Sequence, residues 1–200
     1  MFVIDATIDS AFDAAPRHAE PAAPQCLPTL LGIASAYPPF EVTMEQSWDL
    51  LFAHMSPQVR FGRRIIESTA VRKRHIMWSP ETLLDACEMV TGDRMAAHAD
   101  AVIEVASRSI GQAVEGFDTN RVGSLVMACS TGYVNPGPDL MVAKELGLRS
   151  DLRRTFIGHM GCYAAANVIK VAMDSVAARP DELVIGNCTE LSSAHVRKNP

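Results

Sequence analysis

The sequence predicts an α/β fold with a largely parallel sheet. Apolar runs of strand length alternate with segments of helical periodicity along the chain. Two of these runs, 121–129 and 182–188, are short and mostly apolar, which is typical of strands buried on both faces. Ligand chemistry in such folds gathers in the loops that leave the strand ends. We therefore expect the site in the loops after Cys129 and before Cys162.

Length and composition suit one globular domain or part of a larger one. The 200 residues are 48% hydrophobic and 20% charged, which is enough material for a core. A net charge of −5 argues against nucleic acid as a partner. No apolar run reaches the length of a membrane span, and the N-terminus carries aspartates where a signal peptide has basic residues. We therefore expect a cytoplasmic protein that does not contact a membrane.

Cysteine usage indicates a reducing compartment. The five cysteines are odd in number, widely spread and without CxxC spacing: Cys26, Cys87, Cys129, Cys162 and Cys188. This pattern argues against a disulfide framework and against a zinc site. We expect reduced thiols and no bound metal.

The first quarter of the chain divides into a leader and the start of the domain. Residues 1–28 are rich in alanine and proline, so we expect a flexible leader that can pair briefly through its first four residues. The globular domain is then expected over 29–200. Within it, residues 30–34 predict a short buried strand. Apolar residues at helical spacing predict a helix over 43–54, with Thr43 as its N-cap.

Three more helices are expected in the middle of the chain. Ser79 followed by Pro80 is a typical helix start, with the serine as cap and the proline at the first helical position. A longer helix is predicted over 92–114 by its apolar positions. Another is expected near 139–146, after a segment rich in proline and glycine.

A basic cluster lies between residues 60 and 75. In this segment only Glu67 opposes the positive charges locally, although the protein as a whole is acidic. Several arginines together indicate an anion site, and phosphate is the usual ligand. A solvated basic helix face explains the same residues equally well. The cluster consists of Arg60, Arg63, Arg64, Arg72, Lys73 and Arg74.

The stretch 158–170 places a thiol at the start of a helix. Cys162 follows Gly161 in a turn bounded by glycines, and an alanine-rich segment of helical periodicity comes next. Unpaired backbone N–H groups and the helix dipole would favour the thiolate there, which is a strong nucleophile. The alternative is that Cys162 packs as a small hydrophobic residue. The apolar positions of the helix predict a buried, central element: Ala165, Val168, Ile169, Ala172, Met173 and Val176.

Several motifs together resemble the N-terminal half of type III polyketide synthases, the chalcone synthase-like branch of the thiolase superfamily. They occur in the order of the family, and the match runs from about residue 30 to the end. His75 and Tyr133, which replace a tyrosine and a smaller residue of plant enzymes, make the chain more similar to microbial members. The motifs are 32–39, 72–75, 129–139, 145–149 and 161–165.

The resemblance implies a fold and a reaction. The fold is the thiolase-like αβαβα arrangement of two similar halves, of which this chain holds most of the first, in a homodimer without metal or prosthetic group. Cys162 matches the cysteine that takes the starter acyl group from an acyl-CoA as a thioester. Decarboxylated malonyl-CoA then extends the chain, which cyclises to a pyrone, resorcinol or phloroglucinol. A thiolate suits this task because it attacks thioesters readily and leaves readily.

The resemblance also implies roles for four other residues. Arg60 and Arg63 fall near positions whose basic side chains hold the phosphates of coenzyme A, whereas the third such position falls on or beside Glu67. Thr131 matches a residue that lines the initiation pocket. Asn135 lies near the position that crosses the dimer interface and helps to shape the partner's cavity.

One departure from the family leaves alternatives open. The family's catalytic histidine and asparagine lie in the second half, beyond Pro200, and we expect His159 and His195 to be structural or exposed instead. The chain is therefore expected to be a truncated synthase or a fragment that needs its other half. A β-ketoacyl-acyl-carrier-protein synthase III-like enzyme is one alternative, although its cysteine usually follows two alanines rather than Gly161. A catalytically incomplete fragment that binds coenzyme A is another.

Overall fold

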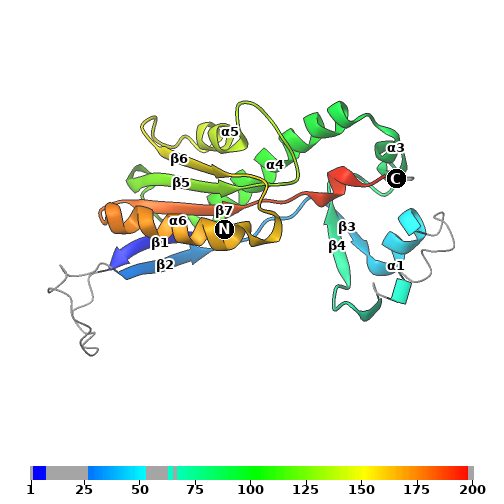
Figure 1. Ribbon diagram of the computed structural model, residues 1–200, viewed down its shortest axis with the longest axis horizontal. Coiled ribbons are helices and arrows are strands. Elements are labelled where there is room, and N and C mark those ends of the chain that lie inside the picture. The colour runs from blue at the N-terminus through cyan, green and yellow to red at the C-terminus, as the bar shows by residue number, and fades with distance from the viewer. Residues whose placement is uncertain (1, 8–26, 53–62, 65–66, 198–200) are drawn as a thin grey trace. The chain divides into compact units, whose positions relative to one another are not determined.

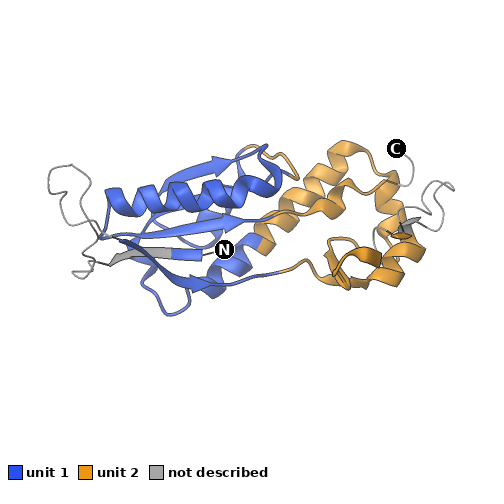
Figure 2. Cartoon of the chain, turned by 60° about the horizontal axis from the view of Figure 1, so that its bottom comes forward, with its two compact units in different colours: residues 1–36, 106–130, 136–189 blue, residues 37–105, 131–135, 190–200 orange. Residues whose placement is uncertain are grey.

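The computed structural model describes residues 2–7, 27–52, 63–64 and 67–197. The chain divides into two compact units, shown in Figure 2. Unit 1 comprises residues 1–36, 106–130 and 136–189, and unit 2 comprises residues 37–105, 131–135 and 190–200. None of the described helices combines the length and the apolar character that crossing a membrane requires.

Unit 1 is built on a five-stranded sheet of order β2-β1-β7-β5-β6. Strand β5, which lies between β7 and β6, pairs in parallel with both, whereas β1 pairs antiparallel with β2 and β7 (Figure 1). All seven residues of β5 are buried, as the sequence predicts for a parallel strand covered on both faces. The predicted α/β class is confirmed. The strands are β1 (Phe2–Thr7), β2 (Leu27–Ile33), β5 (Val122–Ala128), β6 (Arg153–Ile157) and β7 (Leu183–Cys188).

Strand β1 corrects the predicted leader. Residues 1–28 were expected to be a flexible leader that pairs only briefly through its first four residues, but Phe2–Thr7 is a full strand inside the sheet, and β2 begins at Leu27. The ring of Phe2 packs directly over Gly186 of β7, where an added Cβ would lie 2.4 Å from the ring. The prediction was wrong here because it followed the alanine and proline content of the whole segment, although aromatic and β-branched residues open it. Residues 8–26 of the predicted leader lie outside the described residues.

Two helices cover opposite faces of this sheet. Helix α6 (Ala164–Ala178) packs Val168 and its neighbours one turn away against β5 and β7. On the other face, the Nδ2 of Asn187 donates to the Oγ of Ser109 in α4 (Thr91–Ala113) at 3.3 Å. The long helix predicted over 92–114 is thus confirmed, as is the helix near 139–146, which is α5 (Pro138–Glu145).

Helix α6 is buried on one side only. Its stripe of four-residue spacing, Ala164, Val168, Ala172 and Val176, is buried. Ile169 and Met173 are each 43% exposed, so the prediction of a buried, central helix is confirmed for Val168, Ala172 and Val176 and wrong for these two positions. A single sheet can cover only one stripe of a helix, and the second apolar stripe faces away from it.

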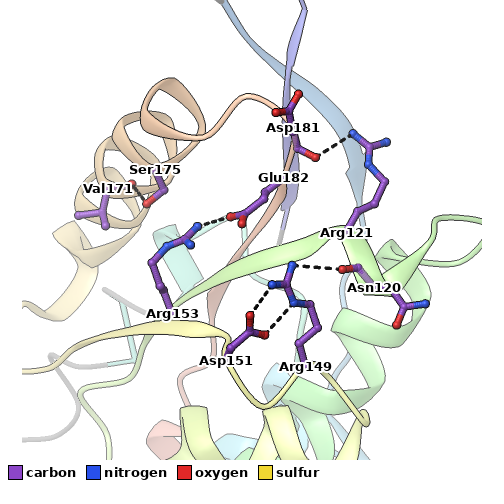
Figure 3. Close-up of polar contacts among 9 residues, drawn as sticks. All are labelled: Asn120, Arg121, Arg149, Asp151, Arg153, Val171, Ser175, Asp181 and Glu182. Atoms are coloured by element: carbon purple, nitrogen blue, oxygen red, sulfur yellow. Dashed lines mark hydrogen bonds and ion pairs between the residues drawn. The ribbon is translucent and has the colours of Figure 1, made fainter.

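The amino-terminal edge of the sheet is tied by ion pairs and hydrogen bonds (Figure 3). Arg149 makes a two-pronged contact with Asp151, at 2.8 and 2.5 Å, just before β6. Arg153 at the start of β6 pairs with Glu182, which precedes β7. Arg121, before β5, donates to the backbone carbonyl of Asp181 at 3.4 Å.

Unit 2 contains a two-stranded antiparallel sheet and a capped helix. Strands β3 (Phe40–Thr43) and β4 (Lys73–Ile76) pair along their whole length. At the end of β3, Thr43 caps α1 (Met44–Ser47) because its Oγ1 accepts the N–H of Gln46 at 3.1 Å and its own N–H donates back to the Gln46 side chain. The predicted cap is confirmed. A π-helical turn, η1 (Trp48–Phe52), continues the helix as far as it is described.

The next helix of unit 2 starts later than predicted. The Oγ of Ser79 accepts the N–H of Thr82 at 3.2 Å, so the serine caps a turn rather than the helix itself. Helix α3 (Leu83–Glu88) follows, with Thr82 at its N-cap position. Its first residue, Leu83, belongs to the core of unit 2 with Val42 and Ile76.

Candidate active site

Cys162 stands on the turn that joins β6 to α6. The strand ends at Ile157, a 3₁₀ turn covers Gly161–Tyr163, and α6 begins at Ala164. Gly161 has a φ of +56°, a left-handed conformation that glycine adopts without steric cost. The Cys162 residue is exposed, so the alternative in which it packs as a small hydrophobic residue is wrong. The predicted position at a helix start is confirmed.

The two loops that the sequence singled out are joined by a hydrogen bond. The N–H of Gly161 donates to the Oγ of Ser130, two residues beyond the end of β5, at 3.1 Å. The N–H of Cys129 donates to the carbonyl of Ile157 at 3.2 Å and extends the ladder between β5 and β6. Ser130 therefore fixes the turn that carries the thiol. Sequence reasoning missed this residue, although a small hydroxyl directly after a buried strand could have indicated it.

A second exposed thiol lies at the same edge of the sheet. Cys188 is the last residue of β7 and is exposed, and its Cα pairs with that of Ala128 in β5. Cys87 and Cys129 are buried, and none of the four described cysteines forms a disulfide. Within the part of the chain that the structure describes, no three His, Cys, Asp or Glu side chains are grouped so as to hold a metal ion.

Thr131 belongs to unit 2 and is held by three other residues. Its Oγ1 accepts the N–H of Leu191 at 2.9 Å and lies 3.1 Å from the Nε2 of His98. Its carbonyl accepts the Nε2–H of His195 at 2.6 Å. His98 is 2% exposed, and this burial, together with the nearby His195, lowers its pKa against an opposing effect of Glu190. His159 is exposed in unit 1, and His195 is exposed in unit 2, as expected.

The basic cluster is more balanced than the sequence indicated. The Nε of Arg63 donates to Glu67 at 2.7 Å, and this partner raises the pKa of Arg63. Lys73 pairs with Glu41 across the β3–β4 hairpin at 2.7 Å and lowers the pKa of that carboxyl. Arg60 lies outside the described residues.

The remaining features of unit 2 are an exposed asparagine and an apolar cavity. Asn135 is exposed in the loop that follows Thr131. The cavity measures about 570 Å³, which is within the range of small-molecule pockets. Its wall at the C-terminal segment is fixed by the Oγ of Ser193, which accepts the N–H of Met77 at 3.2 Å. The cavity is lined by Val42, Ser47, Leu50, Arg74, His75, Ile76, Leu83, Ser192, Ser193 and Val196.

The sequence matches the family described as chalcone and stilbene synthases, N-terminal domain, over residues 18–199. The chain belongs to this family. The match begins inside the predicted leader of residues 1–28, which shortens the segment that lies outside the family domain.

Curated members of the family are similar over most of the chain. The alpha-pyrone synthesis polyketide synthase-like Pks18 of Mycobacterium tuberculosis is 28% identical over 183 residues, which are 88% of this chain and 47% of the relative. Bisdemethoxycurcumin synthase of Oryza sativa subsp. japonica is 30% identical over 161 residues, 74% of this chain and 40% of the relative. The chain thus spans about half the length of the curated synthases that it matches.

A solved structure supports the fold. The crystal structure of the C-terminal type III polyketide synthase domain of Steely1, a type I/III hybrid from Dictyostelium, superposes with a TM-score of 0.74 over 85% of this chain and 49% of the other. At 22% sequence identity this likeness shows the fold alone. The predicted α/β fold is confirmed, with the chain as the N-terminal part of a type III polyketide synthase fold.

Proposed function

We propose that this chain is the acyl-loading part of a type III polyketide synthase. The observation that carries the proposal is the exposed thiol of Cys162 on the turn between β6 and α6, held there by Ser130, in a member of the chalcone and stilbene synthase family. An exposed cysteine at a helix start is placed for nucleophilic attack. By their names, Pks18 is a polyketide synthase-like protein of alpha-pyrone synthesis, and the rice relative makes bisdemethoxycurcumin.

The loading step is a thioester exchange. The Sγ of deprotonated Cys162 attacks the carbonyl carbon of an acyl-CoA, a new C–S bond forms, and the thiolate of coenzyme A leaves and takes up a proton. Malonyl-CoA then loses CO₂, and its carbanion attacks the acyl carbonyl carbon bound to Cys162. The new C–C bond replaces the C–S bond, so the Cys162 thiolate leaves and the extended chain remains on coenzyme A. The extended chain cyclises to a pyrone, resorcinol or phloroglucinol. No prosthetic group enters these steps.

Substrate binding is assigned to residues of unit 2. Arg60 and Arg63 are proposed to bind the phosphates of coenzyme A, Thr131 to line the starter pocket, and Asn135 to reach the partner subunit in a homodimer. The ion pair between Arg63 and Glu67 bears on this assignment, because a phosphate must compete with that carboxylate or share the guanidinium with it.

The exposed apolar stripe of α6 is proposed to pack against the second half of the synthase. Ile169 and Met173, four residues apart on α6, form this stripe. Its apolar character requires a cover in the whole enzyme. The second half would supply it, since the matched relatives are about twice as long as this chain.

The test is intact mass spectrometry after incubation with a panel of acyl-CoAs. Wild type is compared with Cys162→Ala and with Cys188→Ala, which removes the other exposed thiol at the same edge. We expect an acyl adduct on wild type and on Cys188→Ala, and none on Cys162→Ala. An adduct that survives Cys162→Ala would overturn the assignment. No adduct on a chain that circular dichroism shows to be folded would favour the fragment that only binds coenzyme A.

A further inference from the structure

Two loops of the sheet reach unit 2 immediately after the strands end. Residues 131–135 follow β5 and its extension, residues 190–200 follow β7, and both segments belong to unit 2 together with the first half of α4. The loop after β5 carries Thr131, the residue assigned to the starter pocket. What holds these two segments in place therefore bears on the site.

Thr131 is held at its hydroxyl and at its carbonyl by two different imidazoles. His98, on α4, contacts the hydroxyl, and His195, from the segment after β7, donates to the carbonyl. A carbonyl can only accept, so His195 carries a proton on Nε2. The hydroxyl also takes the N–H of Leu191, which ties the two segments to each other directly.

The backbone after Thr131 lies flat against the His98 ring. A Cβ added at Gly132 would lie 2.2 Å from the Nδ1 of His98, so only glycine fits at this position. His98 is 2% exposed as a result. A ring enclosed in this way cannot change rotamer without displacing the loop.

Arg94 fixes the other segment from one helical turn away. It is 4% exposed and donates to the carbonyls of Ala194 and Val196, at 3.2 and 3.5 Å, on either side of His195. The C-terminal end of the short 3₁₀ turn η5 (Ser192–His195) is thereby attached to α4. These bonds fix the backbone on both sides of His195.

We infer that His98 and His195 are positioning residues that set the place of Thr131 and, through it, the selection of the starter acyl group. Only the second part of this inference, the selection of the starter acyl group, rests on the proposed function. His98 acts as a neutral imidazole whose Nε2 accepts the Thr131 hydroxyl, and His195 acts as a donor to the carbonyl. We call His98, Thr131, Leu191 and His195 the threonine clamp.

Charges around His98 make the clamp sensitive to acid. Burial and His195 lower the pKa of His98, whereas Glu190 raises it. Arg94 lies one turn away on the same helix, and Arg197 donates to Thr91 at 3.2 Å near the start of that helix. A proton on His98 would add a buried cation among these groups and remove the acceptor of the Thr131 hydroxyl.

The experiment compares two replacements of His98 in the 200-residue chain. His98→Gln places a polar atom where Nε2 stands, and His98→Leu has a similar bulk but no polar atom. The readout is NMR hydrogen exchange of the Leu191 amide, whose acceptor is Thr131. We expect exchange to be about tenfold faster in His98→Leu and near wild type in His98→Gln. His75→Gln, a histidine of the same unit that stacks on Tyr37, is the matched control and should change nothing at Leu191.

Acidification provides a readout that a merely structural residue would not move. In wild type the protection factor of the Leu191 amide should fall as the pH drops from about 7.5 to about 5.5, and in His98→Leu it should stay low and flat. Should His98→Leu fail to fold, Thr131→Val and Thr131→Ser replace it. The valine removes the hydroxyl and the serine retains it, so only the valine should speed exchange.

Starter selection is measured on the same variants by mass spectrometry with the acyl-CoA panel. We expect the ratio between the best-loaded and the worst-loaded starter to fall at least about threefold in His98→Leu and to recover in His98→Gln. If the Leu191 amide exchanges at the wild-type rate in His98→Leu and Thr131→Val, the inference that the clamp holds Thr131 is wrong, whatever the acylation result. If exchange is faster but the starter ratio is unchanged, the inference that the clamp sets starter selection is wrong. A wild type that loads no starter would overturn the proposed function, and hydrogen exchange would still decide the clamp.

Discussion

The three parallel strands of unit 1, β5, β6 and β7, begin at one edge of the sheet and end at the opposite edge. The side chains at these two edges differ in type and in their contacts. At the amino-terminal edge, arginines and carboxylates pair with one another around the starts of β5, β6 and β7, as Figure 3 shows. At the carboxyl edge, the same strands end in thiols and small hydroxyls, with Cys162 and Cys188 exposed and Ser130 bonded to the turn that carries Cys162.

The difference shows which edge is free to carry chemistry. At the amino-terminal edge, Arg149 and Arg153 already have carboxylate partners and Arg121 donates to a backbone carbonyl, so these side chains fix where the strands begin. The carboxyl edge presents exposed thiols, and a hydrogen bond from the backbone of Gly161 to Ser130 supports the turn that carries Cys162. Parallel strands bring their ends together at one edge, so substitutions there should affect reactivity, and substitutions at the other edge should affect only stability.

The largest effect is expected in a comparison of thiol reactivity across the carboxyl edge. With iodoacetamide near pH 7, Cys162 should be labelled about tenfold or more faster than Cys188, because only Cys162 stands at a helix start. Buried Cys87 and Cys129 should react more slowly than either. Peptide mass spectrometry after timed quenching measures all four rates. Equal rates at Cys162 and Cys188 would show that exposure alone controls labelling and that the turn does not activate the thiol.

A smaller effect is expected when the support of that turn is removed. Ser130→Ala leaves the N–H of Gly161 without its acceptor, which should cost about 1 kcal/mol of stability and slow the labelling of Cys162 several-fold. Ser175→Ala is the matched control, because its hydroxyl bonds to the carbonyl of Val171 on α6, within the same unit. If both variants label at the wild-type rate, Ser130 does not control the position of the thiol.

The smallest effect is expected at the amino-terminal edge. Arg153 lowers the pKa of Glu182, so this pair stabilises the fold above the unfolded pKa of about 4.3 and loses its contribution as the pH falls through the folded value. Glu182→Gln should therefore lower stability by no more than about 1 kcal/mol at pH 7, and by less in high salt. Chemical denaturation at pH 7 and pH 3 measures this. Cys162 labelling should stay unchanged, and a slower rate would contradict the separation of the two edges.

Local patterns in the sequence were sufficient to predict most of the helices, strands and turns around the thiol. The continuously apolar run that became β5, the long amphipathic α4 and the glycine turn before Cys162 each depend on residues close together in the chain. Such patterns reflect burial on both faces of a strand, helical periodicity and the conformational freedom of glycine. The same local reasoning identified Thr43 as a helix cap.

The predictions that failed concern contacts between distant residues. The place of Phe2–Thr7 between β2 and β7 depends on Gly186 leaving room for the ring of Phe2. The core of unit 2 joins Leu83, at the late start of α3, to Val42, which lies 41 residues earlier in the chain. Neither partner is near in sequence, so no window of neighbouring residues could indicate the outcome.

The sequence by itself determined the α/β class, the family and the cysteine on which the proposed chemistry depends. Periodicity, turn chemistry and motif order are local properties and can be read along the chain. The tertiary structure decided that Ser130 supports the thiol turn, that Glu41 neutralises Lys73 of the basic cluster, and that two histidines hold Thr131. These are pairings of polar groups up to 64 residues apart. A polar side chain satisfies its hydrogen bonds with whichever partner folding brings near, so its role depends on the three-dimensional arrangement rather than on its place in the sequence.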